Sequence, residues 1–304
     1  MQDAISNQQS AYHIERVSQT DDVDRNVYEA MRVYLADDLG VSEDIARSRA
    51  EQELQRRIPK AAVAALTSAG VVLKDADVLD LGSGLGAMSE ELALCGARVV
   101  SLEPGAAWAS LTRRRVERHT AQFRLLEAFG EAIPLPSASM DVVVSLQVLE
   151  HVQDPQKVLS EAWRVLRPGG SFYLACENYL AFREAHYQLP WLPLLPKRLG
   201  SLYLRALGRS PDFLNNAVTY TTYPAVLRDC RRLGFVRRRD EEVELGLRAK
   251  PGMKWKLLRA LAAVGGAKLP LWLDRSRYTF KLGLYELFRK PAGGGDRVEA
   301  GPRA

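Results

Sequence analysis

The chain has 304 residues, of which 47% are hydrophobic, and carries a formal net charge of +5. This length and composition suit one enlarged domain with a large core, or a domain with a lid. The mild basicity permits an anionic substrate or a membrane surface but requires neither. Residues 1–10 are polar and lack a signal-peptide core, and no apolar run approaches the roughly 18 residues of a membrane-spanning helix. We therefore expect a cytoplasmic protein.

The cysteines are few and scattered, at Cys95, Cys176 and Cys230. They show no pairing pattern, which is typical of a reducing compartment. Together with the four histidines they show no metal-ligand spacing, and we expect no metal.

Residues 20–66 are predicted to be helical, because Val27, Met31 and Leu35 recur at helical spacing. Gly40 ends this run, and Ser42 is placed to cap the next helix. The resulting helical extension, residues 1–66, has two interpretations. It packs on the edge of a sheet, or it forms a lid that contributes Tyr12 and Tyr34 to a substrate site. The sequence does not separate the two.

The segment 78–86 places Gly82, Gly84 and Gly86 between an apolar run and a helix predicted over 87–94. Glycines in such a strand-to-helix turn let a ligand approach main-chain N–H groups. Alone, this pattern also fits the fingerprint of a dinucleotide site, with Glu103 near the position of a ribose-binding acid.

From residue 77 onward strand and helix patterns alternate, which predicts a mostly parallel sheet with helices on both faces. The predicted strands are 78–81, 98–102, 123–127, 141–145 and 171–175, with two later ones at 235–245 and 278–288. Ligands of such sheets gather at the carboxyl ends of the strands. Asp80, Glu103, Glu131 and the segment 145–151 follow strands in this way, so we expect them to form one site.

Three motifs carry a family resemblance. Residues 80–86, Asp-Leu-Gly-Ser-Gly-Leu-Gly, resemble the first motif of the class I S-adenosylmethionine-dependent methyltransferases. Residues 145–152 and 164–170 resemble two later signatures of their small-molecule, type 11-like subgroup. The resemblance implies an α/β, Rossmann-like domain over 67–290, with a seven-stranded sheet whose last strand is antiparallel. It also implies S-adenosylmethionine as the cofactor and makes nicotinamide binding the lesser alternative.

The resemblance further implies which residues hold the cofactor. The glycine loop receives its amino-acid end, Asp80 assists the ammonium, and Glu103 accepts hydrogen bonds from both ribose hydroxyls. The family usually has an aspartate where Phe129 stands, so either Glu131 or the backbone of Gly130 takes over the adenine contact. The cofactor residues expected in full are Asp80, Gly82, Ser83, Gly84, Gly86, Glu103, Pro104, Gly130, Glu131, Ala132, Ser145, Leu146 and Gln147.

His151 is the candidate catalytic base, because it follows the fourth strand beside the expected methyl group. Its alternative role is structural, in fixing the loop. An aromatic insertion at 177–223 is expected to cap the acceptor pocket, and a second insertion at 250–277 adds to it; residues 291–304 are predicted to be disordered. The expected substrate residues are Tyr12, Tyr34, Asn178, His186, Tyr187 and Tyr220.

We therefore interpret the chain as a methyltransferase that acts on oxygen or nitrogen of a small-molecule or carrier-linked acceptor, such as a sugar, lipid or natural product. The rivals are a nicotinamide-dependent oxidoreductase and a non-catalytic cofactor-binding module. The proline-rich, basic segment 189–209 also suits contact with an anionic membrane. The arginine groups at 113–118 and 228–239 alternate with acids, and we expect no nucleic acid partner. The acceptor and the oligomeric state stay open.

Overall fold

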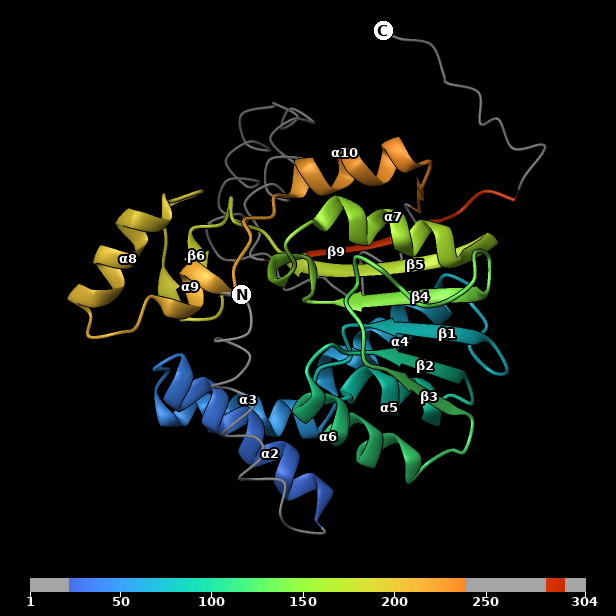
Figure 1. The fold of residues 1–304 in the computed structure, drawn as a ribbon, viewed down its shortest axis with the longest axis horizontal. Helices are drawn as coiled ribbons and strands as arrows, with labels where there is room; N and C mark the ends of the chain where they lie inside the picture. Colours follow the sequence, from blue (N-terminus) through green and yellow to red (C-terminus); the bar gives the residue numbers. More distant parts are fainter. Residues whose placement is uncertain (1–21, 239–282, 293–304) are drawn as a thin grey trace, which may run out of the picture.

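The computed structural model describes residues 22–238 and 283–292. Their main feature is a seven-stranded sheet in the order β3-β2-β1-β4-β5-β9-β8 (Figure 1). All its neighbouring strands run parallel except around β9, which is antiparallel to both β5 and β8. The strands are β1 Asp77–Leu81, β2 Arg98–Leu102, β3 Phe123–Leu126, β4 Met140–Leu146, β5 Leu166–Glu177, β8 Val236–Arg237 and β9 Gly283–Arg289. The predicted mostly parallel α/β fold is confirmed.

The strand predictions hold to within one residue for β1 to β3, and β4 extends one residue further at each end. Strand β5 begins at residue 166, five residues before the predicted start at 171, because residues 166–170 also make sheet contacts. Gly169 donates to Lys290 O at 2.7 Å, and Lys290 donates back to Gly170 O at 2.9 Å. The predicted antiparallel last strand is confirmed over 283–289, and the other residues of the two late strands, 239–245 and 278–282, lie outside the described part.

Helices cover both faces of the sheet, and adjacent residues of a strand supply the two cores (Figure 1). On one face Leu79 packs with residues of α7 Pro155–Val165 and α10 Tyr223–Leu233. On the other face Val78 packs with residues of α4 Arg57–Ser68, α5 Ala87–Leu94 and α6 Ala106–Glu117. Since side chains alternate along a strand, apolar residues on both faces of β1 require helices on both sides.

The N-terminal helices are α2 Val23–Val33, a π-helical turn η1 Tyr34–Asp38, and α3 Glu43–Leu54. Val27 and Ala30 of α2 are buried against Leu85 of the glycine loop. Helix α2 therefore packs directly on the segment predicted to bind the cofactor. Ser42 stands at the start of α3 as expected, but its side chain makes no capping hydrogen bond.

A buried ion-pair network joins the N-terminal helices to the sheet domain. Arg115 of α6 is 1% exposed and bonds to Glu90 Oε2 at 2.7 Å and Glu53 Oε1 at 2.9 Å. Arg56 and Arg118 also reach Glu90, at 3.0 and 2.7 Å. The prediction of a solvated arginine face is wrong for Arg115, whose charge faces α3 and α5 instead.

The insertion after β5 folds around its own small apolar core, and we call residues 178–222 the cap. It contains β6 Arg183–Glu184, β7 Leu189–Pro190, α8 Lys197–Ala206 and α9 Asp212–Asn216. Its core residues are Tyr179, Tyr187, Trp191, Leu204, Leu214 and Val218. The insertion predicted at 250–277 and the tail from 293 lie outside the described residues.

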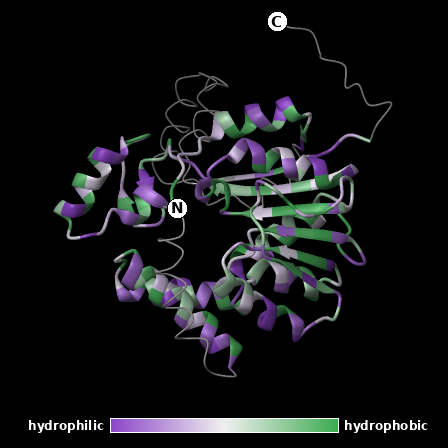
Figure 2. Cartoon of the chain, viewed as in Figure 1, coloured by the Kyte–Doolittle hydropathy of each residue, from purple (hydrophilic) through white to green (hydrophobic). Residues whose placement is uncertain are grey.

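Hydrophobic residues, coloured green, concentrate in the strands, whereas the covering helices carry both green and purple residues (Figure 2). Among residues 22–238 and 283–292, none of the helices combines the length and the apolar composition that crossing a lipid bilayer requires. The three cysteines are free; Cys176 and Cys230 are buried.

Candidate active site

The glycine loop between β1 and α5 turns sharply, with positive φ at Gly82 (78°), Gly84 (53°) and Gly86 (82°). Each of these angles lies in the region that favours glycine. A Cβ on Gly82 would overlap the side chain of Val148, and one on Gly86 would lie 2.9 Å from the Cα of Thr112. Around Gly84 nothing lies within 4 Å of such a Cβ. The loop is therefore packed at two glycines and open at the middle one.

Glu103 holds the open part of this loop from the end of β2. Its carboxylate accepts hydrogen bonds from the backbone amides of Gly84 at 2.9 Å and Gly105 at 3.0 Å. Burial raises the pKa of Glu103, and the two amides counteract this shift. The neighbouring Pro104 is exposed. Sequence spacing thus located an acid that does lie against the glycine loop.

Asp80 lies in β1, directly before the loop, and is buried. Ser89 of α5 donates its hydroxyl to Asp80 Oδ2 at 2.5 Å and lies at the same distance from the hydroxyl of Ser101 in β2. Burial raises the pKa of Asp80 to about 7, even though the bonds from Ser89 favour its charged form. The charge of Glu103 contributes to this rise, and in the sheet register Asp80 pairs with Ser101, two residues before Glu103.

Several polar atoms around the loop are buried without a partner among the described residues. They include the hydroxyls of Ser83 and Ser145 and the side-chain oxygen of Gln147. Gln147 also has a positive φ of 57°, and its amide nitrogen donates to Glu177 Oε1 at 2.5 Å. Buried polar groups are normally hydrogen-bonded, so an orphaned group indicates a ligand or water. Leu146, by contrast, packs against the apolar cluster under α4 and α5.

In the segment predicted to contact adenine, residues 128–132, exposed and buried residues follow one another. Phe129 is 63% exposed, whereas Gly130 is buried against Val158 and Leu81. Glu131 accepts from the backbone amides of Gln153 and Asp154 at 3.1 and 3.4 Å, just before α7. Its other oxygen is buried without a partner among the described residues. Glu131 therefore supports α7 with one oxygen and leaves one for a ligand; Ala132 is exposed.

His151 and His186 meet at the end of β4, although 35 residues separate them. Their Nε2 atoms lie 3.3 Å apart. Solvent reaches the His151 side chain, but many protein atoms surround it, and this environment together with His186 lowers the pKa of His151 to about 4. Burial lowers the pKa of His186 too, but the hydrogen bond and charge of Glu184 outweigh it and raise that pKa.

Glu150 and Glu184 are buried beside these histidines; the sequence indicated only a structural role for Glu150, in fixing the loop together with His151, and no role for Glu184. Glu150 accepts from the amide of Glu177 at 3.3 Å, and burial with the charge of Glu177 raises its pKa to about 8. Glu184 bonds to His186 Nδ1 at 2.8 Å. Glu150 stood inside a recognised motif, which was the available signal, whereas Glu184 is two residues from His186 and comes near His151 only through the fold of the cap.

An aromatic group lies next to the histidine pair. Tyr34 makes edge contacts with Trp108 at 5.7 Å and Phe213 at 6.1 Å between ring centroids. Phe213 lies 5.7 Å from His151 and 5.0 Å from His186. The N-terminal helices, α6 and the cap thus converge on one place. Phe213 lies in the aromatic insertion predicted at 177–223 but was not among the expected substrate residues, and neither was Trp108.

The other predicted substrate residues of the cap are bonded within the cap or to the start of α10. Tyr187 is fully buried; it donates to Ser210 O at 2.8 Å and accepts from the amide of Leu214. Tyr220 donates to Leu195 O at 2.7 Å and stacks on Tyr179. Asn178 accepts from the amide of Tyr223 at 3.1 Å. These contacts stabilise the cap itself. Of the predicted substrate residues that the structure describes, only Tyr34 and His186 contact Phe213 at the place where the helices and the cap converge, apart from an edge contact of Tyr187. Tyr12 lies outside the described residues.

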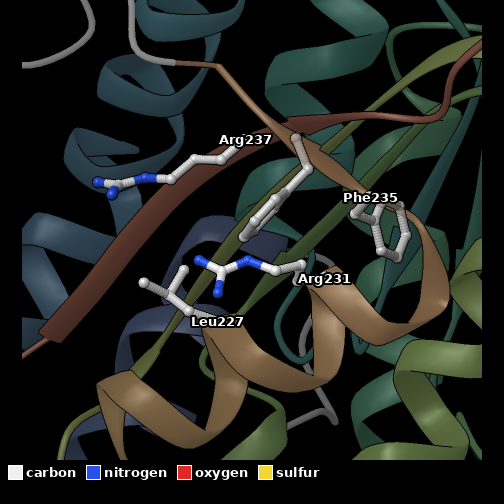
Figure 3. Close-up of a pocket in the computed structure, with 5 residues that line it drawn as sticks. Leu227, Arg231, Phe235 and Arg237 are labelled. Carbon is white, nitrogen blue, oxygen red and sulfur yellow. The ribbon is translucent and has the colours of Figure 1, made fainter. Parts of the chain in front are cut away.

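A separate hollow of about 180 Å³ lies between α10 and strands β8 and β9 (Figure 3). Leu227, Arg231, Phe235, Arg237 and Phe288 line it. Arg237 donates to both carboxylate oxygens of Glu286, through Nε and Nη2. None of the converging acids, glycines or histidines belongs to this hollow, so it is not the candidate active site.

Comparison with known proteins agrees with this geometry. Residues 79–174 match the family described as a methyltransferase domain. A Mycolicibacterium smegmatis protein, described as an S-adenosylmethionine-dependent methyltransferase, is 34% identical over 137 residues, which are 45% of this chain and 51% of that protein. A ubiquinone biosynthesis O-methyltransferase of Methylobacterium sp. 4-46 is 33% identical over 122 residues, 38% of this chain and 49% of that protein. The chain thus spans about half the length of these curated relatives.

One solved structure supports the fold. It is described as a sarcosine dimethylglycine methyltransferase from Galdieria sulphuraria, with a TM-score of 0.52 and 18% identity. The match covers 79% of this chain and 88% of that one. At this identity the likeness concerns the fold alone.

Proposed function

Because residues 79–174 belong to the class I S-adenosylmethionine-dependent methyltransferases, with S-adenosylmethionine as cofactor, we propose that the whole chain transfers a methyl group to an oxygen or nitrogen of a small or carrier-linked acceptor. The observation that carries the proposal is the meeting of Glu103 with the amide of Gly84. A nicotinamide cofactor, the earlier rival, is not supported by the family match.

The residues around the loop fit this cofactor. The ionised Glu103 suits two ribose hydroxyls, and the open surface at Gly84 admits a ligand against the backbone. Asp80 suits the ammonium, while the orphaned hydroxyls of Ser83 and Ser145 offer donors and acceptors. When bound, the cofactor supplies an electrophilic methyl group on a sulfonium. The protein's task is then to hold the acceptor in line with that methyl and to keep the acceptor's proton from hindering attack.

Oxygen is the favoured acceptor atom. The imidazoles of His151 and His186 offer acceptors for the proton that an acceptor hydroxyl must lose. The buried carboxyls of Glu150, Glu177 and Glu184 lie beside them. The curated relatives also include O-methyltransferases. The aromatic faces of Tyr34 and Phe213 suit an acceptor with a flat apolar part. His151 orients its ring through Ala217 O at 2.8 Å, so its Nε2 is the atom that faces the acceptor side.

Calorimetry and a methyl-transfer assay test this function together. We expect heat on titration with S-adenosylmethionine and none with NAD, and transfer of labelled methyl from the cofactor to hydroxylated acceptors. His151→Ala should reduce turnover strongly while it leaves cofactor affinity nearly unchanged. Cofactor binding without transfer to any acceptor would mean a binding module instead.

We also propose that the cap rests on an anionic membrane and receives a lipid-linked acceptor there. Helix α8 turns Leu199 and Leu202, 53% and 60% exposed, away from the protein, and the exposed Arg198 and Arg205 flank them. Leu192 and Leu194 add exposed apolar surface before the helix. Apolar side chains beside arginines favour the interface of an anionic bilayer.

Sedimentation with phosphatidylserine vesicles checks the membrane contact. We expect salt-sensitive binding of the intact protein and its loss in the double variant Leu199→Ser with Leu202→Ser. Leu94→Ser, at an exposed leucine of α5 outside the cap, is the matched control and should leave binding unchanged. Equal sedimentation of both variants would contradict the proposal.

A further inference from the structure

The cluster formed by Glu150, His151 and His186 has an arrangement that the sequence spacing did not reveal. Glu150 and His151 belong to the short helical turn η2 Leu149–His151 after β4, and His186 follows β6 in the cap. One oxygen of Glu150 and one nitrogen of each histidine lie within 4.8 Å of one another. The cap therefore completes a group of three potential ligands.

Hydrogen bonds determine which nitrogen of each histidine carries a proton. His151 Nδ1 lies 2.8 Å from the carbonyl oxygen of Ala217, which only accepts, so Nδ1 must donate. His186 Nδ1 lies 2.8 Å from the carboxylate of Glu184 and donates in the same way. In neutral rings both Nε2 atoms then carry lone pairs. The two Nε2 atoms lie 3.3 Å apart, so either a second proton on one ring, which the Glu184 carboxylate favours on His186, or a cation bound to both nitrogens joins them.

Glu150 offers the third ligand atom, and a cation bound beside it would favour the ionised form of this carboxyl. Its side chain is 0% exposed, and one oxygen accepts from the amide of Glu177. The other oxygen has no partner among the described residues. A buried carboxylate oxygen without a hydrogen bond or cation is strongly unfavourable. The Glu150 carboxyl and the two imidazoles thus bring three potential ligand atoms into one small volume.

We propose that Glu150, His151 and His186 bind one divalent transition-metal ion, of the zinc or manganese type, through the Glu150 carboxylate and the two Nε2 atoms. Two imidazoles with one carboxylate suit such ions better than magnesium or calcium, which prefer oxygen ligands. Bonds of about 2.1 Å at a tetrahedral angle place two ligand nitrogens about 3.4 Å apart, close to the observed separation. Glu184 and the Ala217 carbonyl act as the outer partners that orient metal-bound histidines.

The open coordination positions give the ion a use at this site. Three protein ligands leave room for water or for an acceptor hydroxyl. A bound cation would make that hydroxyl more acidic, and its proton would then pass to solvent. This role rests on the proposed function, but metal binding does not. In this arrangement His151 holds the ion and does not itself take the proton.

Metal uptake by the intact protein is the direct test. The protein is stripped with chelator, titrated with Zn²⁺ in a calorimeter, and its metal content measured after dialysis. We expect one equivalent of Zn²⁺, a weaker response to Mg²⁺, and severe loss of affinity in His151→Ala, His186→Ala and Glu150→Gln. Glu184→Gln should bind one equivalent about 10–100-fold more weakly, because it removes an orienting partner.

His119→Ala is the matched control, because His119 also bonds to a buried carboxylate, Glu90, at 2.8 Å, but lies outside the cluster. It should bind Zn²⁺ like the unaltered protein. Electron paramagnetic resonance of the Cu²⁺-loaded protein should show two nitrogen ligands, and one in each histidine variant. Titration with S-adenosylmethionine reports separately on the fold and the cofactor site. No Zn²⁺ uptake by protein that binds this cofactor, or equal uptake in the histidine variants, would overturn the proposal while the proposed function stands.

Discussion

Glu103 Oε2 accepts a hydrogen bond from the backbone amide of Gly84 at 2.9 Å, which ties the end of β2 to the glycine loop. We expect Glu103→Gln to weaken S-adenosylmethionine binding about 10–100-fold, because hydrogen bonds to a charged group contribute about 1.5–3 kcal/mol. Calorimetric titration measures the change. Glu127→Gln, at an exposed acid after β3, should bind normally, and equal affinities of the two variants would contradict a ribose role for Glu103.

Gly82 and Gly84 should differ when each is replaced by alanine. Both have positive φ, which costs about 1 kcal/mol for alanine. Only at Gly82 would the new Cβ also meet Val148. We therefore expect Gly82→Ala to lower the unfolding free energy clearly more than Gly84→Ala does, in denaturant titrations. Gly84→Ala should chiefly weaken cofactor binding, and a reversed order of stabilities would argue against this loop geometry.

Asp80 should make both stability and cofactor affinity depend on pH. Its pKa is raised from 3.8 to about 7, so between these values the folded state binds more protons than the unfolded state. The contribution of Asp80 to the unfolding free energy should then fall as the pH rises through this window. Ser89, Glu103 and Glu53 are the groups that act on Asp80. Denaturant titrations from pH 4 to 8 measure the slope, which Asp80→Asn should reduce.

Cofactor affinity should change in the opposite direction. An ammonium favours the ionised Asp80, so S-adenosylmethionine should bind more tightly as the pH rises toward and past 7. Below that pH, binding should release a proton, which calorimetry in buffers of different ionisation enthalpy detects. Ser89→Ala removes a hydrogen bond that favours the charged form and should move the transition to higher pH. A pH-independent affinity in the unaltered protein would rule out this role for Asp80.

Arg115 and Arg113 offer a paired test of the buried network. Arg115→Met leaves Glu53 and Glu90 without their shared buried partner and should lower the unfolding free energy by about 3–5 kcal/mol. Arg113 is exposed and lies 3.8 Å from Glu117, so Arg113→Met should change stability by less than about 1 kcal/mol. Thermal or denaturant unfolding compares the two variants. Similar losses would show that the network contributes little.

Phe213 should affect the acceptor and not the cofactor. It contacts Tyr34 and both histidines, so Phe213→Ala should raise the KM for the acceptor and leave the cofactor Kd unchanged. Steady-state kinetics with a hydroxylated acceptor measure this. Phe182→Ala, at an exposed phenylalanine of the cap, is the comparison and should leave KM unchanged. A change in cofactor Kd alone would move Phe213 out of the acceptor site.

The sheet and the cofactor side were predictable because they depend on local patterns. Apolar runs followed by glycine or acid identify strand ends, and parallel strands bring such ends together. Asp80 and Glu103 could therefore be paired from spacing alone. The start of β5 could not, because the bonds of Gly169 and Gly170 with Lys290 join residues more than 100 positions apart.

The acceptor side was less predictable because the cap decides it. Tyr187 and Tyr220 look like ligands in sequence, yet their hydroxyls bond to cap carbonyls. His186 reaches His151 only because the chain turns back after β6. Sequence spacing does not reveal that turn. The histidines therefore show no metal-ligand pattern in the sequence.

The ion pairs of Arg115 also bear on how far the chain can be shortened. The family match begins at residue 79, but Glu53 lies on a helix well before that point. A version that starts near residue 70 would expose the apolar faces under α2 and α4. It would also leave Arg115 with Glu90 but without Glu53. The smallest soluble catalytic fragment should therefore keep α2 to α4, and deletion libraries should show a sharp fall in expression once α3 is removed.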